Sequence, residues 1–253
     1  MKQRLVSHPV RSIDDVRTFF DRVAETYGES HGPAAKLLAY RVGILRRLLP
    51  PPRGLLVELG CGPGDHLFAL AEGFERALGL DLSPAMIEHA EAQRLKHPLR
   101  DQIAFAVDTA EELATLRDGT ADALFCVGAF EHILRKDAAV RQVHRVLKRD
   151  GSFVCLTLNG GYLWYTRLSR WLDHETRHLT SDRFLSEVDL RELLVRAAFH
   201  IDTFDYWTFI PRGDMPRAVG NLLGGLDYLG RLLRLTSLRG GICFRAVRDD
   251  KRV

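Results

Sequence analysis

Short apolar segments alternate with helix-like segments between residues 55 and 158, and this alternation constrains the fold more than any other feature of the chain. The apolar segments are LLVEL (55–59), ALGLDL (77–82), IAFAV (103–107), ALFCV (123–127) and SFVCLTL (152–158). Helices are expected between them from about His66, from Pro84, over EELATL (111–116) and up to about Lys148. Strands joined by helical crossovers run parallel, and helices cover both faces of such a sheet. The pattern therefore predicts an α/β fold.

The segment before residue 53 is interpreted as an N-terminal helical cap. Ser12 and Asp15 form a capping box ahead of a stretch with helical apolar spacing, and a second helix is expected over about residues 34–49. Three prolines at 50–52 must end that helix, because proline lacks an amide hydrogen and disfavours helix in the residue before it. We therefore assign residues 1–52 to the cap.

The composition is that of an ordinary globular protein. Of the 253 residues, 46% are hydrophobic and 27% charged, and the net charge of +3 is too small to indicate a nucleic-acid partner. No apolar run reaches the roughly 18 residues of a membrane span, and none follows the charged first ten residues, so no transmembrane segment or secretory signal is expected. The spacing of the four cysteines matches no zinc or disulfide framework. A reduced, cytoplasmic setting is therefore expected.

A glycine-rich loop, ELGCGPG (58–64), directly follows the first apolar segment. Glycines at alternate positions let the backbone turn sharply and approach a ligand, and the following helix directs its N–H groups at that ligand. A dinucleotide fingerprint needs a glycine or alanine three residues after Gly62, where this chain has Asp65. The carboxylates of Glu58 and Asp65 would serve a pyrophosphate poorly, and they suit a cationic sulfonium that carries an amino group.

Two further acids stand at the ends of the next two apolar segments. Asp81 occupies the place of a ribose-binding acid after the second strand. Asp108 follows the third strand, where a carboxylate can accept a hydrogen bond from an adenine amino group. One such acid alone is readily explained as a solvated strand end. Three acids at successive strand ends beside a glycine loop indicate a binding site.

Five stretches, VELGCGPG, LGLDLSPAMIEHA, FAVDTAEEL, DALFCVGAFEHI and HRVLKRDGSFVCLTL, occur in this order. In them, residues 55–158 resemble the class I S-adenosylmethionine (SAM)-dependent methyltransferases, in the branch that includes the ubiquinone and menaquinone biosynthesis methyltransferases. The resemblance implies SAM as cofactor, with the glycines at its methionine part, Asp81 on the ribose hydroxyls, and Asp108 at the adenine. The predicted cofactor-binding residues are Tyr27, Glu58, Gly60, Cys61, Gly62, Gly64, Asp81, Leu82, Met86, Asp108, Thr109, Ala110 and Val127.

His132 is the candidate catalytic residue. It follows the fourth strand in GAFEH (128–132), where an acceptor must meet the methyl group, and its ordinary pKa suits a general base near neutral pH. The alternative is that His132 only caps or orients the next helix. The stretch lacks the Asn/Asp-Pro-Pro-aromatic motif of enzymes that methylate the amino groups of DNA bases, which disfavours a nucleic-acid acceptor.

Residues 159–185 leave the fifth strand on the ligand side and are expected to line the substrate pocket. HETRH (174–178) in this segment fits the metalloprotease pattern H-E-x-x-H, but its polar flanks and the lack of a third ligand at family spacing predict no metal site. The predicted substrate-binding residues are Tyr162, Tyr165, His174 and His178. The aromatic residues of the segment could instead only pack it down.

A leucine-rich segment lies between the last two expected strands, HIDTFDYW (200–207) and GICFRAV (241–247). If these strands pair as a hairpin, residues 211–239 form an insertion at its tip. Four leucines, Leu222, Leu226, Leu229 and Leu233, repeat at helical spacing, with Leu223 and Leu232 beside them. The stripe fits a helix packed on the core, a pocket lid, a homodimer face or a peripheral membrane patch. We expect it to cover the acceptor pocket and select an apolar substrate.

Together these features predict one α/β domain over residues 1–253: a Rossmann-like, seven-stranded, mostly parallel sheet with its last strand antiparallel. Residues 53–158 form the SAM-binding core, and the two insertions lie on the substrate side. The expected function is methyl transfer from SAM to a small acceptor, such as a phenol, quinol or natural-product intermediate. A non-catalytic SAM-binding partner protein and an NAD(P) oxidoreductase are the alternatives.

Overall fold

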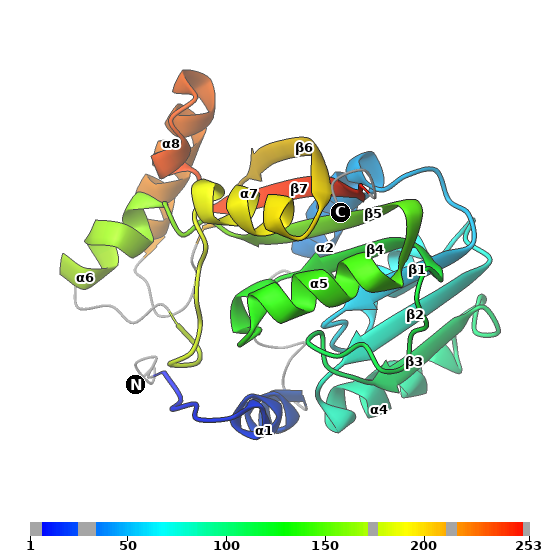
Figure 1. Ribbon diagram of the computed structural model, residues 1–253. Coiled ribbons are helices and arrows are strands. Elements are labelled where there is room, and N and C mark those ends of the chain that lie inside the picture. Colours follow the sequence, from blue (N-terminus) through cyan, green and yellow to red (C-terminus); the bar gives the residue numbers. More distant parts are fainter. Residues whose placement is uncertain (1–6, 25–33, 172–176, 211–216, 250–253) are drawn as a thin grey trace.

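The computed structural model describes residues 7–24, 34–171, 177–210 and 217–249 of the chain. Its seven strands form one sheet in the order β3-β2-β1-β4-β5-β7-β6 (Figure 1). The strands are β1 (Leu55–Leu59), β2 (Arg76–Asp81), β3 (Ile103–Val107), β4 (Ala121–Val127), β5 (Leu147–Leu158), β6 (Phe199–Trp207) and β7 (Gly241–Arg248). The first five pair in parallel, and β7 runs antiparallel to both β5 and β6. The predicted sheet, with its antiparallel last strand, is confirmed.

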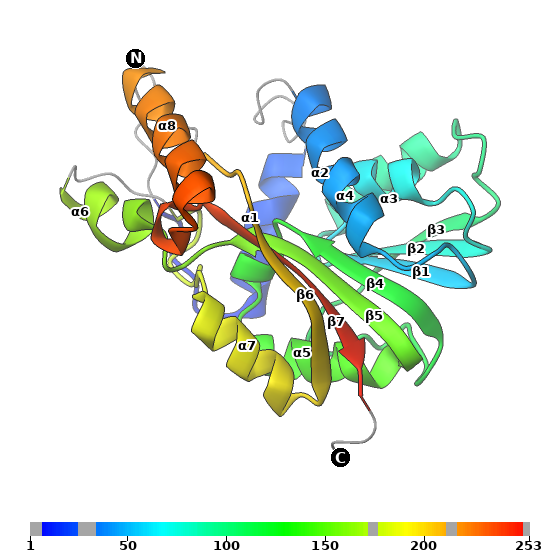
Figure 2. The same ribbon diagram turned by 90° about the horizontal axis from the view of Figure 1, so that it is seen from above.

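Helices cover both faces of this sheet (Figure 2). On one face lie α5 (Lys136–Val146) and α7 (Glu187–Arg196), and on the other lie α2 (Ala34–Leu48) and α3 (Asp65–Leu70), each face having its own apolar core. The remaining elements are α1 (Ile13–Val23), α4 (Pro84–Arg94), η2 (Phe130–His132), η3 (Trp164–Leu168), α6 (Ser169–Trp171), α8 (Arg217–Leu233) and η4 (Thr236–Leu238). Every residue of the central strand β4 is buried, as expected for a strand covered on both sides.

Local signals in the sequence place several helix starts correctly. The capping boxes of Ser12 with Asp15 and of Ser186 with Asp189 both form, at the first residues of α1 and α7. The Ser83 side chain caps α4 by accepting a hydrogen bond from the Met86 amide, with Pro84 in the first turn. These side chains satisfy amides that the first turn of a helix leaves unpaired.

Two local expectations are wrong. Residues 111–116 form turns and no helix, because the Asp108 carboxylate accepts hydrogen bonds from the Thr115 amide and hydroxyl and holds the segment in a loop. The helix before β5 ends at Val146, short of the expected end near Lys148, because β5 already begins at Leu147.

The leucine-rich insertion is a helix, α8, between the two strands of the predicted hairpin. Its predicted leucine stripe faces mostly outward: Leu222 is 61% exposed, Leu229 40% and Leu233 54%. Leu223 is the leucine that is buried, in a small cluster with Tyr162 and Trp164. The alternative in which the whole stripe packs on the core is therefore wrong: of its four leucines, Leu226 is the one that packs against this cluster, half-buried. Over the described ranges, no helix combines the length and the apolar character that crossing a membrane requires.

The Ser83 hydroxyl joins two helices, because it also donates to Asp21 of α1 at 2.5 Å. We expect Ser83→Ala to lower the free energy of unfolding by about 1–2 kcal/mol, the usual loss for a helix cap. It should also raise amide exchange in residues 13–24, since α1 loses its attachment. Urea unfolding and hydrogen–deuterium exchange measure the two effects. Ser186→Ala, which removes a cap that contacts no other helix, should lower stability without loosening α1. Equal exchange of α1 in both variants would contradict this prediction.

Candidate active site

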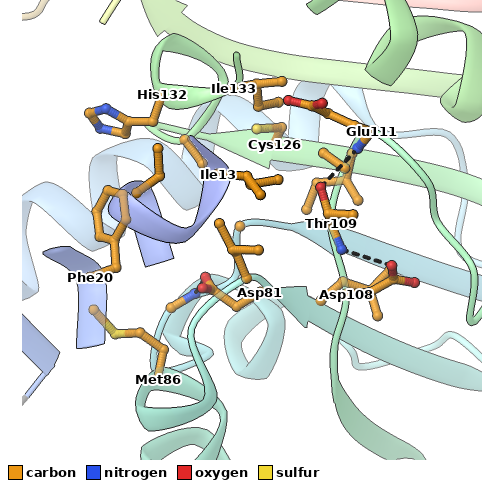
Figure 3. Close-up of a pocket in the computed structure, with 18 of the residues that line it drawn as sticks. Ile13, Phe20, Asp81, Met86, Asp108, Thr109, Glu111, Cys126, His132 and Ile133 are labelled. Carbon is orange, nitrogen blue, oxygen red and sulfur yellow. Dashed lines mark hydrogen bonds between the residues drawn. The ribbon is translucent and has the colours of Figure 1, made fainter. Parts of the chain in front are cut away.

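A pocket of about 840 Å³ opens where the carboxyl ends of β1, β2 and β4 meet α1 (Figure 3). This volume includes space open to solvent at the mouth of the pocket, and the position is where open α/β sheets bind ligands. The lining residues are Ile13, Val16, Phe20, Leu59, Gly60, Gly62, Leu80, Asp81, Leu82, Met86, Asp108, Thr109, Ala110, Glu111, Cys126, Val127, Gly128, Ala129, His132, Ile133 and Leu134. Nine of the thirteen predicted cofactor-binding residues are in this lining, and so is His132.

Asp81 connects the glycine loop to the start of α4. Its Oδ2 accepts from the Gly62 amide at 2.8 Å, and its Oδ1 accepts from the Ser83 amide at 2.9 Å. Burial raises the pKa of Asp81, and the hydrogen bonds from these amides work against that rise. Each carboxylate oxygen has two lone pairs, so one acceptor position per oxygen remains for a ligand.

The glycine loop lies close to the end of β4. Gly60 adopts a φ of +64°, and a Cβ built on it would lie 2.3 Å from the Cβ of Ala129. Only glycine combines this backbone conformation with this close approach. The loop therefore brings bare backbone to the pocket wall between β1 and β4.

Asp108 and Thr109 form the wall opposite His132 (Figure 3). Asp108 Oδ1 accepts from the Thr109 amide at 2.7 Å, while Oδ2 accepts from the Thr115 amide and hydroxyl. Three of the four acceptor positions of this carboxylate are thus used within the chain. One acceptor position, on Oδ1, therefore remains for the predicted hydrogen bond from an adenine amino group.

Three predicted cofactor residues lie outside the lining. The Glu58 side chain is 1% exposed, and its nearest basic atom is His66 Nδ1 at 3.4 Å, too long for a good hydrogen bond. Burial raises the pKa of Glu58 and outweighs the opposing effect of His66. Cys61 is buried against Gly79, and Gly64 begins α3 beside Phe105. Their assignment to the cofactor stays a prediction, as does that of Tyr27, which lies outside the described residues.

His132 is held by an aspartate that the sequence analysis did not select. His132 Nδ1 lies 2.6 Å from Asp182 Oδ1, and Asp182 Oδ2 accepts from the amides of His178 and Leu179. Burial by itself would lower the pKa of His132, but the hydrogen bond to Asp182 and the charges of Glu131 and Asp182 raise it, against an opposing charge on Lys136. No local pattern links two residues fifty positions apart, so only the fold reveals this pair.

Helix α1 supplies an apolar wall that was also missed. Ile13, Val16 and Phe20 line the pocket, and the Phe20 ring meets the His132 ring edge-on at 5.1 Å. The chain before α1 is fastened to the segment that carries Asp182, since His8 pairs with Leu179 and the Val10 amide donates to Thr180. The apolar spacing of α1 was the available signal, but it did not say which surface the helix covers.

The predicted substrate residues are not brought together at the pocket. Tyr162 and Tyr165 are packed against each other, with ring centroids 5.6 Å apart, in the cluster beneath α8. The ring of His178 lies 6.2 Å from that of His132, outside the lining. His174 lies outside the described residues, so the metalloprotease pattern remains untested. Within the described ranges, no three His, Cys, Asp or Glu side chains are arranged to hold a metal.

The charges of the pocket suit SAM better than a pyrophosphate. Its lining contains the acids Asp81, Asp108 and Glu111, and no lysine or arginine among the described residues. Glu111 is neutralised by Arg135 at 2.6 Å, which leaves the acids of β2 and β3 facing a ligand. A cation with ribose hydroxyls fits this lining, with Leu82 and Met86 available to an adenine face, whereas the pyrophosphate of NAD(P) would meet uncompensated negative charge.

Comparisons with known proteins agree with this geometry. Residues 57–155 match a family described as a methyltransferase domain. A ubiquinone biosynthesis O-methyltransferase of Xanthomonas axonopodis pv. citri is 27% identical over 143 residues, which are 55% of this chain and 59% of the relative. The chain thus spans less than two thirds of the length of this relative.

Solved structures share the fold at low sequence identity. The [4+2]-cyclase SpnF superposes with a TM-score of 0.68 at 16% identity, covering 96% of this chain and 99% of SpnF. A geranyl diphosphate C-methyltransferase from Streptomyces coelicolor A3(2), in complex with Mg²⁺, geranyl diphosphate and S-adenosyl-L-homocysteine (SAH), gives 0.67 at 14%, covering 93% and 97%. Such distant likenesses establish the fold alone. Residues 57–155, which match the methyltransferase domain, contain the glycine loop, Asp81 and most of the pocket lining.

Proposed function

We propose that this chain transfers the methyl group of SAM to a hydroxyl of a small apolar acceptor, with His132 as the general base. The observation that carries the proposal is the pair of His132 and Asp182, with His132 in the wall of the pocket that also contains Asp81 and Asp108. When bound, SAM supplies an electrophilic methyl group. The chain must supply position, exclusion of water, and a group that takes the hydroxyl proton.

Asp182 orients His132 for this task. With Nδ1 hydrogen-bonded to the carboxylate, the neutral ring carries its proton on Nδ1 and leaves the lone pair of Nε2 for the acceptor. Asp182 itself is fixed by the amides of His178 and Leu179, and its pKa is lowered by the hydrogen bond to His132 despite its burial. The pair therefore stabilises the imidazolium that forms when His132 takes a proton.

The acceptor side of the pocket is apolar. Phe20 and Ile13 of α1 lie on this side near His132, and α1 covers the region from outside. A phenol or quinol suits these surfaces, because its ring can pack on Phe20 while its hydroxyl meets the base. An anionic acceptor such as the diphosphate named for the S. coelicolor protein would find no lysine or arginine in the described lining.

SAM binding is the first test. Asp81→Ala should weaken the binding of SAM and of SAH by about 1–3 kcal/mol, since a carboxylate hydrogen-bonded to the ribose is lost. Calorimetry on the full chain measures the change. Asp101→Ala, which removes an exposed acid outside the pocket, is the matched control and should bind normally. Failure of the unaltered, folded protein to bind SAM at about millimolar ligand, a weak affinity even for a small molecule, would remove the basis of the proposal.

The role of the pair is tested by Asp182→Asn. The side-chain oxygen of the asparagine can still accept hydrogen bonds from the two backbone amides, so its NH₂ group faces His132 Nδ1. Nδ1 must then accept a hydrogen bond, which places the ring proton on Nε2 and leaves no lone pair there to act as the base. We expect kcat to fall by roughly 10²–10⁴-fold, as for loss of an oriented general base, with SAM affinity unchanged. Asp137→Asn, on the exposed start of α5, is the control. Unchanged kcat in Asp182→Asn would leave His132 a structural residue.

The pH dependence has a definite sign. The base acts as neutral imidazole, so the rate should rise with pH through a pKa above the usual value near 6.5, because the pKa of His132 is raised in the folded chain. Loss of the Asp182 charge should move this acidic limb of the kcat profile to lower pH. A limb that does not move between the unaltered protein and Asp182→Asn would assign it to another group.

The acceptor class is tested with a panel of phenols, quinols, amines and carboxylates, and with geranyl diphosphate, measured by SAH formation. Neutral phenols or quinols should be methylated and the anions should not, because the described lining offers an anion no lysine or arginine. Methylation of geranyl diphosphate alone would overturn the acceptor assignment. SAM binding with no turnover of any acceptor would favour the alternative of a non-catalytic SAM-binding protein.

A further inference from the structure

The leucine stripe of α8 has the spacing of a two-helix seam, with Leu222, Leu229 and Leu233 exposed and Leu226 half-buried against the cluster of Tyr162 and Trp164. Leu222, Leu226, Leu229 and Leu233 are separated by four, three and four residues. This alternation is that of the a and d positions of a coiled coil. On an α-helix the four side chains fall within about 60° of arc, a strip narrow enough to be covered by one partner helix.

Buried contacts on the other side fix the rotation of α8 and keep this stripe outside. Asp227 is 2% exposed and accepts from the Thr208 hydroxyl at 2.7 Å and from Arg239 Nε at 3.3 Å. A Cβ on Gly230 would meet the Leu238 Cβ at 2.7 Å, so the helix also lies close against η4. Turning α8 to bury its leucines would take Asp227 away from these partners and leave Arg239, which is 8% exposed, buried without its counter-charge, which is strongly destabilising.

The helix itself needs more support than the chain gives it. The helix contains glycine at positions 220, 224, 225 and 230. Glycine lowers the stability of a helix more than any other residue except proline, so the intrinsic stability of α8 is low. Within the described residues, Leu223 is the only apolar side chain of α8 that is fully buried. Figures 1 and 2 both show the helix standing at one end of the molecule, beyond the sheet. A covering partner would supply the missing contact.

The geometry points to a second copy of this chain, and we propose that α8 pairs with α8 of the partner in a two-fold dimer. The stripe carries no charge, so two identical faces meet without repulsion. Ala218 and Gly225 lie along one flank of the stripe, where small side chains let two helices approach closely. A helix lying on a lipid surface would carry a rim of lysines or arginines along its length, whereas the arginines of α8 stand at its two ends, Arg217 and Arg231, with neither residue type between them.

The dimer is independent of the proposed catalysis. α8 contributes nothing to the described lining of the pocket, so pairing through its outer stripe leaves that pocket free. The expectation that this insertion covers the pocket finds no contact in the described residues. The helix instead stands at the tip of the β6–β7 hairpin, where it can meet another molecule.

The test compares the full chain with Leu222→Glu/Leu229→Glu. Sedimentation velocity from about 1 to about 200 µM covers the dissociation constants of weak interfaces. The unaltered chain should dimerise, and the double variant should raise the dimer dissociation constant by at least about tenfold, since each partner would bury two carboxylates. Leu95→Glu is the matched control, because Leu95 is 62% exposed and Leu222 61%. Circular dichroism and SAM binding check that each variant is folded.

A second variant reports contact directly. All four native cysteines are buried, so Leu229→Cys introduces an exposed thiol that mild oxidation should cross-link between copies, while Leu95→Cys should not. A monomer across the whole concentration range overturns the proposal, and so does a dimer that survives Leu222→Glu/Leu229→Glu. Flotation with phosphatidylcholine/phosphatidylglycerol vesicles, lost in the double variant, would assign the stripe to a membrane and overturn it as well.

Discussion

The carboxylate of Asp81 is the contact on which the candidate site depends. By accepting from the Gly62 amide and the Ser83 amide, it fastens the loop after β1 to the turn after β2. That turn begins α4, and its Ser83 hydroxyl reaches Asp21 of α1. One half-buried acid thus fixes the loop, the helix start and, through Ser83, the apolar wall over the pocket. Its remaining acceptor positions are the ones offered to a ligand, so positioning and binding come from the same group.

A second set of contacts closes the acceptor side. The segment at residues 177–182 pairs with the chain at 8–10, and its Asp182 holds His132. The helix that covers the pocket and the residue proposed as base are therefore fixed by one segment. Because each partner is far from the others in sequence, their arrangement exists only in the folded chain. Local patterns therefore indicate the cofactor side of the pocket but not its acceptor side.

The sequence predicts well where the chemistry is local. The glycine loop, Asp81 and the cap at Ser83 are each specified by neighbouring residues, and the sheet follows from regular alternation. Prediction from the sequence fails where the structure of a segment is decided by one contact with a residue outside that segment. Asp108 diverts residues 111–116 from a helix into a loop by accepting from Thr115. Tyr162, predicted in the pocket from its segment, packs with Leu223 of α8, which is sixty-one residues away. Neither outcome has a signature in a short window of residues.

Helix α8 is a further case in which the sequence predicts a local pattern but not the contact that the pattern makes. Hydrophobic spacing correctly identified the stripe of Leu222, Leu226, Leu229 and Leu233. Periodicity shows which side of a helix is apolar, but it does not show what that side packs against. The direction is decided by Asp227, a single polar residue that is buried with Thr208 and Arg239 on the opposite side. An apolar stripe is stable facing the core or facing another molecule, whereas a buried carboxylate needs its own partners. The polar residue therefore fixes the helix, and the leucines are left to whatever approaches from outside.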